Sequence, residues 1–141
     1  MEDRREEPRG MQHCEPLPPE IERIATQIVD AAFKVHSTLG PGLLESVYEA
    51  CLAHELRKRG LHVERQKKVT IWYDGDQLDD AFREDLLVEN CVIVEVKAVE
   101  TMNPVFTAQT LTYLKLTDKR LAFLINFNVV RIKDGIKRLI R

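Results

Sequence analysis

The stretch CVIVEVKAVE, residues 91–100, limits the possible folds of this chain more than any other. Its Val and Ile residues are typical of a buried β-strand, yet it also carries Glu95 and Lys97. Because side chains alternate between the two faces of a strand, Glu95 and Lys97 point to the same face. A buried carboxylate and ammonium are costly unless they are paired or bind something. The stretch therefore indicates either a structural ion pair at a sheet edge or a functional site.

The pattern of apolar residues around this strand predicts a single domain. Apolar residues recur at spacings of three and four in the segments 19–38 and 43–60, which predicts two helices, and Asn103-Pro104 is a typical start for a third helix. Alternating or continuous apolar runs predict the strands. The expected order is helix (19–38), helix (43–60), strands (69–73, 82–88, 91–98), helix (103–117), strand (120–127), then a short strand and turn.

This order favours an α/β or α+β fold in which helices flank a central mixed sheet. The domain is expected to cover residues 20–141. Residues 1–19 contain four prolines and almost no apolar side chains, which is typical of a flexible leader.

The register between the second and third strands decides whether Asp85 joins Glu95 and Lys97. A three-residue loop at 89–91 would pair Val88 with Val92, which places Asp85 opposite Glu95. The same register would place Arg83 opposite Lys97 and turn Glu84 to the other face. It is favoured because it leaves an almost wholly apolar face for a helix to cover: Leu86, Val88, Val92, Val94 and Val96.

Asp85, Glu95 and Lys97 together have the chemistry of metal-dependent phosphodiester hydrolysis. Hard cations such as Mg²⁺ bind one or two carboxylates together with water and phosphate oxygens. A nearby ammonium can stabilise the charge that develops on the phosphate or activate the attacking water.

Composition narrows the classes of protein and the kinds of partner to be considered. The longest apolar runs, CVIV and LAFLI, are far below the roughly 20 residues needed to span a bilayer, so no membrane partner is expected. Three scattered cysteines and a charged N-terminus favour a cytoplasmic protein without a disulfide framework or a structural zinc site. The net charge of −2 neither favours nor excludes nucleic acid as a partner.

Several motifs, in order along the chain, resemble one known family. The pattern of Asp85 followed by Glu95-Val96-Lys97, preceded by a helix that carries a glutamate, is similar to the PD-(D/E)XK nuclease superfamily. GLLESVY at 42–48 resembles the signature of its GxxExxY branch, and QTLTYLKL at 109–116 resembles the QxxxY element of RecB-type nucleases. The proline of the superfamily name is replaced by Glu84. The resemblance extends over about residues 20–141.

The resemblance implies a restriction-endonuclease-like fold and a role for each matching residue. Glu45, Asp85, Glu95 and the backbone carbonyl of Val96 would bind Mg²⁺ or Mn²⁺, and Lys97 would position the water or the phosphate. Gln109, Tyr113 and Tyr48 would contact the substrate or brace the site. The implied reaction is hydrolysis of DNA phosphodiester bonds to 5′-phosphate and 3′-hydroxyl ends.

Two alternatives stay open at this point. The chain may have kept the nuclease fold as a non-catalytic nucleic-acid-binding or regulatory protein, or it may be an interaction protein that uses the helix at 103–117. RNA as the substrate, a homodimer and a protein partner are also open.

Overall fold

The structure is a computed structural model that describes residues 15–141, so most of the leader predicted at 1–19 lies outside the described residues. The predicted order of helices and strands is confirmed, and the short strand expected at the end of the chain is β5. The elements are α3 (Pro19–Leu39), α4 (Glu45–Lys58), β1 (Val63–Tyr73), β2 (Asp76–Val88), β3 (Val92–Lys97), α5 (Pro104–Thr117), β4 (Leu121–Asn126), η1 (Ile132–Gly135) and β5 (Ile136–Ile140).

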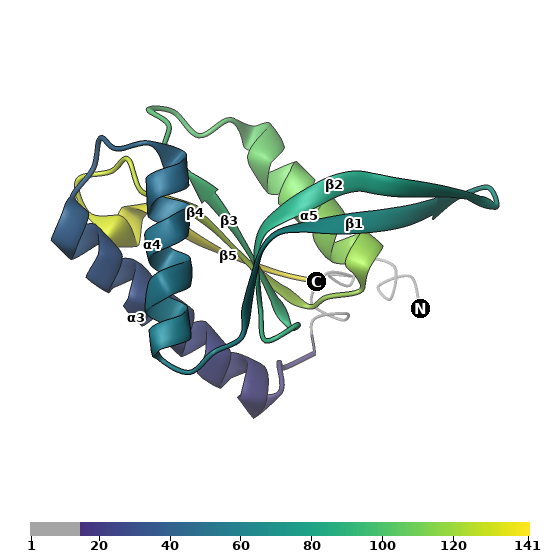
Figure 1. Ribbon diagram of the computed structural model, residues 1–141, viewed down its shortest axis with the longest axis horizontal. Helices are drawn as coiled ribbons and strands as arrows, with labels where there is room; N and C mark the ends of the chain where they lie inside the picture. The colour runs from purple at the N-terminus through teal and green to yellow at the C-terminus, as the bar shows by residue number, and fades with distance from the viewer. Residues whose placement is uncertain (1–14) are drawn as a thin grey trace, which may run out of the picture.

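The five strands form one mixed sheet with helices on both faces. The strand order is β1-β2-β3-β4-β5, with β3 and β4 parallel and the other neighbours antiparallel. Helices α3 and α4 cover one face, and α5, which connects the parallel strands β3 and β4, covers the other (Figure 1). The architecture is therefore α+β with a central mixed sheet, as expected.

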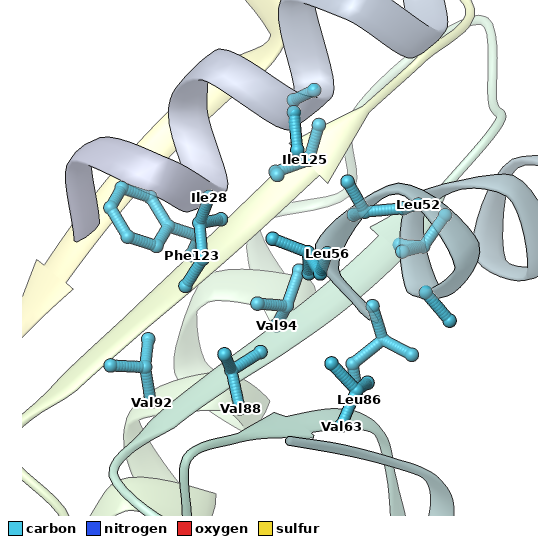
Figure 2. Packing of buried hydrophobic residues seen from close by; sticks show 14 of the residues in the cluster. Ile28, Leu52, Leu56, Val63, Leu86, Val88, Val92, Val94, Phe123 and Ile125 are labelled. Carbon is cyan, nitrogen blue, oxygen red and sulfur yellow. The ribbon is translucent and has the colours of Figure 1, made fainter. Parts of the chain in front are cut away.

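A large apolar core fills the space between the sheet and α3 with α4. Figure 2 shows Ile28 of α3 and Leu52 and Leu56 of α4 among side chains from the strands. The apolar face predicted for β2 and β3 is confirmed, because all of its members lie in this first core cluster: Leu86, Val88, Val92, Val94 and Val96.

The opposite face of the sheet carries a second, smaller core cluster beneath α5. Its buried members are Leu87, Ile93, Leu114, Ala122, Leu124 and Leu139. Only Thr110 and Leu114 of α5 are fully buried, so this helix covers its face more lightly than α3 and α4 cover theirs.

The predicted register between β2 and β3 is confirmed. Val88 pairs with Val92, Leu87 with Ile93 and Leu86 with Val94. The loop between the strands holds Glu89 and Asn90 in the left-handed conformation, with φ values of 53° and 54°. Such a loop fixes Asp85 opposite Glu95.

Strands β1 and β2 are longer than the sequence predicts and form a hairpin that projects beyond the rest of the sheet (Figure 1). Asp74 and Gly75, both at positive φ, make its turn. Within residues 15–141 no helix is both long and apolar enough to cross a bilayer.

Candidate active site

Strand β3 places Glu95 and Lys97 on the face covered by α5. Val94 and Val96 face the first core cluster, and Glu95 and Lys97 alternate with them. Glu95 is only 5% exposed, whereas Lys97, the last residue of the strand, is half-buried. The shared face expected from the sequence is therefore present at the carboxyl end of β3.

Asp85 and Glu95 hold each other through the backbone. The backbone N–H of Asp85 donates to Glu95 Oε2 at 3.1 Å, and the N–H of Val96 donates to Asp85 Oδ2 at 2.8 Å. The register between β2 and β3 ends one residue earlier, at Leu86 and Val94. The two carboxylates thus act as acceptors at the point where the backbone pairing of these strands stops.

At Asp85 the regular alternation of side chains along strand β2 is interrupted. Phe82 stacks on Tyr113 of α5, with ring centroids 4.1 Å apart, whereas Leu86 belongs to the first core cluster beneath α4. Residues 82 and 86 would share a face in a regular strand. Opposite Asp85, Gln66 of β1 adopts a left-handed conformation with φ 52°, and the pairing of β1 with β2 skips this position. We infer that this irregularity turns the strand.

Two expectations for the side chains of β2 are wrong because of this irregularity in the strand. Glu84 lies on the α5 side like Phe82, and its charge raises the pKa of both Glu95 and Tyr113, so it does not face away from the site. Arg83 does not pair with Lys97: it lies opposite Lys68 of β1 and forms an ion pair with Asp80 at 3.1 Å.

Helix α4 directs two glutamates toward Asp85. Glu45, the first residue of the helix, is exposed, and its pKa responds to the charges of Lys97 and Asp85. Glu49, one turn later, is buried and accepts hydrogen bonds from Arg65 at 3.2 Å and from Gln66 at 2.9 Å. The Gln66 side chain also donates to Asp85 Oδ1 at 3.3 Å.

Sequence reasoning missed Glu49 and Gln66. Glu49 follows Glu45 by four residues, the spacing that places two side chains on one helix face, so this spacing was a usable signal. No comparable signal marks Gln66, because its role depends on its left-handed backbone.

Helix α5 places Tyr113 and Gln109 near the acids. The pKa of Tyr113 is raised by burial and then by the charges of Glu95, Asp85 and Glu84, whereas a hydrogen bond with Gln109 lowers it. Gln109 is exposed and Tyr113 is half-buried. The two residues therefore lie together at the edge of the site.

Tyr48 lies apart from this group, in the first core cluster. Its side chain is fully buried and stacks on Phe127 with centroids 4.7 Å apart. Its hydroxyl donates to the Gly40 carbonyl at 2.6 Å and accepts from the Leu43 N–H at 3.0 Å. In this structure Tyr48 braces the turn that leads into α4.

Burial and mutual repulsion dominate the electrostatics of the acids. Burial, followed by the charge of Asp85, raises the pKa of Glu95 to about 9. Burial also raises the pKa of Asp85, of Glu45 and of Glu49, while Lys97 lowers the pKa of Glu45, Asp85 and Glu95. The site therefore gathers four acids, which Lys97 and, at Glu49, Arg65 partly offset.

The residues of the site fit a hard divalent cation by their chemistry. Glu95 Oε1 and the Glu45 carboxylate accept no hydrogen bond from the described residues, and a cation would relieve the repulsion that raises the acids' pKa values. Among residues 15–141, however, no three His, Cys, Asp or Glu side chains are close enough to hold a metal ion as they stand. The exposed Glu45 would have to approach Asp85 and Glu95.

A cavity of about 620 Å³ lies between the start of α5 and the segment 134–137, and its lining includes none of Glu45, Glu49, Asp85 and Glu95.

A comparison with family models identifies one family. The model described as the PD-(D/E)XK nuclease superfamily matches residues 22–139, and the fold is consistent with a restriction-endonuclease-like domain. The match does not separate the GxxExxY branch from other branches. Comparisons with curated proteins and with solved structures gave no significant match.

Proposed function

This chain belongs to the PD-(D/E)XK nuclease superfamily, and from that premise we propose that it is a metal-dependent nuclease that hydrolyses DNA phosphodiester bonds. The observation that carries the proposal is that the Glu95 carboxylate accepts from the Asp85 N–H and the Asp85 carboxylate from the Val96 N–H, with Lys97 two residues beyond Glu95 on the same face. Such a rigid pair of acids beside one ammonium suits attack on a phosphodiester.

In the proposed reaction each residue has a separate role. Asp85 and Glu95, together with Glu45 and the Val96 carbonyl, would hold Mg²⁺ or Mn²⁺, which would supply polarisation of the phosphate and a lower pKa for a water molecule. Lys97 orients that water or stabilises the charge on the phosphate. Gln109 and Tyr113 contact the backbone of the substrate at the edge of the site.

The backbone hydrogen bonds to Asp85 and Glu95 also support a role for these two acids in binding a cation. Asp85 Oδ2 and Glu95 Oε2 are fixed by backbone N–H groups, so their positions do not depend on flexible side-chain partners. Glu49 and Gln66 add a second support from α4 and β1, because Gln66 bonds to both Glu49 and Asp85. A preorganised group of this kind loses little entropy when it binds.

The proposal is tested by cleavage assays on linear, circular and single-stranded DNA and on RNA, in Mg²⁺ and in Mn²⁺, with EDTA as a control. The Lys97→Ala and Asp85→Asn variants should each lose at least about 10²-fold in cleavage rate while remaining folded. Lys133→Ala, which changes an exposed lysine on η1, serves as the matched control and should cleave normally.

Each result has a clear meaning. Full activity in Lys97→Ala would refute the role of the lysine, and full activity in Asp85→Asn would refute the site. Absence of cleavage in the wild type, together with calorimetric binding of Mn²⁺ that Asp85→Asn abolishes, would favour an enzyme that needs a partner. Absence of both cleavage and metal binding would favour the non-catalytic alternative.

A further inference from the structure

The ammonium of Lys97 rests on the ring of Phe106. Its Nζ lies 4.3 Å from the ring centroid, well within the roughly 6 Å at which a cation is attracted to an aromatic face. Among residues 15–141 Lys97 forms no ion pair. The aromatic ring is therefore the neighbour that the structure provides for this charge.

The start of α5 brings Phe106 to this position. Asn103 caps the helix by accepting from the Val105 N–H at 2.9 Å, and its carbonyl accepts from the Phe106 N–H at 2.9 Å. Phe106 lies in the first turn, half-buried against the second core cluster. Its ring is thereby held above the end of β3, where Lys97 ends the strand.

The absence of an ion pair at Lys97 is unusual, given its surroundings. The lysine lowers the pKa of Glu45, Asp85 and Glu95, so all three acids lie within its electrostatic reach. A lysine has a flexible four-carbon stem and readily closes on a nearby carboxylate. Such closure would occupy a carboxylate oxygen and at least one N–H of the ammonium.

An aromatic ring holds a cation without these consequences. The ring attracts the charge through its quadrupole and takes up none of the carboxylate oxygens. The three N–H donors of the ammonium stay available for a water molecule or a phosphate oxygen.

We propose that Phe106 is a positioning residue that keeps the Lys97 ammonium away from the carboxylates and directed at the reacting phosphate. The consequence for catalysis rests on the proposed nuclease function, whereas the contact between ring and lysine does not. If Phe106 only packed against the second core cluster, a leucine of similar size would replace it without effect.

The test compares Phe106→Leu with Phe106→Tyr. In nuclear magnetic resonance spectra, the ring should shift the ε-methylene protons of Lys97 upfield in the wild type and in Phe106→Tyr, and this shift should disappear in Phe106→Leu. In cleavage assays, kcat should fall about 2- to 30-fold in Phe106→Leu with KM for DNA unchanged, and Phe106→Tyr should stay within about twofold of the wild type. Phe106→Met is the second variant if Phe106→Leu does not fold.

The two readouts separate the possible failures. A wild-type spectrum without the upfield shift would overturn the contact. A shift that Phe106→Leu removes without any fall in kcat would overturn the positioning role. A wild type that neither cleaves any substrate nor binds Mn²⁺ would overturn the catalytic consequence together with the proposed function, and the spectra would still decide whether Phe106 holds Lys97.

Discussion

The two faces of strand β3 show how one short segment can serve stability and chemistry at once. Val92, Val94 and Val96 point into the first core cluster, a large group of buried hydrophobic side chains beneath α3 and α4. On the other face, Ile93 belongs to the second core cluster, and the next position on that face is the buried carboxylate of Glu95. Successive residues of β3 therefore alternate between a fully apolar face and a face that carries a buried carboxylate.

The two faces of the sheet contribute to the free energy of unfolding with opposite signs. Apolar burial is the main stabilising contribution, and the first core cluster contains most of the fully buried large side chains. Buried carboxylates without full compensation are destabilising. The acids on the α5 face thus lower the free energy of unfolding, and apolar burial on the α3–α4 face must offset this loss. The margin is small, because the net stability of a domain is typically about 5–15 kcal/mol.

The largest expected effect comes from the α3–α4 face. Phe123 is 1% exposed, and Phe123→Ala should lower the free energy of unfolding by about 3–5 kcal/mol because it leaves a cavity in the first core cluster. On the other face, Phe82→Ala removes only the half-buried stack on Tyr113 and should cost about 1–2 kcal/mol. Urea unfolding measures both, and equal losses would contradict the contrast between the faces.

A smaller effect of opposite sign is expected at Glu95. Its pKa rises from 4.5 to about 9, so between these values the folded state keeps a proton that the unfolded chain releases. The contribution of Glu95 to the stability of the metal-free protein is therefore fully present below about pH 4.5 and is lost as the pH rises toward 9. Glu95→Gln, which can still accept the Asp85 N–H, should add about 2–4 kcal/mol at pH 8 and almost nothing at pH 4.

Urea unfolding in EDTA at pH 4 and pH 8 tests this prediction for Glu95. Glu100→Gln, at an exposed position, is the matched control and should change stability by less than about 0.5 kcal/mol at either pH. A Glu95→Gln variant that is less stable than the wild type at pH 8 would show that the α5 face does not carry the destabilisation assigned to it.

The smallest of the three effects is expected at Glu84. This side chain is 1% exposed, its Oε2 has no hydrogen-bond partner among residues 15–141, and burial raises its pKa to about 7. The ionised carboxylate therefore destabilises the fold above pH 7, and Glu84→Gln should add about 1–2 kcal/mol at pH 8.5 but not at pH 4. Thermal unfolding at both pH values measures the difference, and a gain of the same size at pH 4 would exclude the ionisation of Glu84 as its cause.

Much of the fold and the centre of the site could be predicted from the sequence because the pattern of polarity allows few solutions. Only one register of β2 and β3 gathers Asp85 with Glu95 and leaves an apolar face, and that register is present. Glu45, at the start of α4, was proposed instead from the resemblance to the nuclease superfamily, and its role in the site stays a prediction.

The remaining features depend on local backbone conformations that residue patterns do not reveal. The left-handed conformation of Gln66 coincides with the point where β2 turns over, and it accounts for the unexpected burial of Glu84. The position of Phe106 relative to Lys97 depends on how α5 docks against the sheet, which alternation and spacing cannot specify. The full length of the β1–β2 hairpin was missed because its exposed strands are largely polar.

The backbone hydrogen bonds to the Asp85 and Glu95 carboxylates make two amide hydrogens into reporters of the site. The amides of Asp85 and Val96 donate to the same carboxylates that are proposed to hold the cation. Protonation or metal loading of either acid must therefore alter the electron density at these amides, and their chemical shifts follow the state of each carboxylate separately. The same arrangement means that truncation to alanine removes part of the framework together with the charge, so Asn and Gln are the variants that isolate chemistry from architecture.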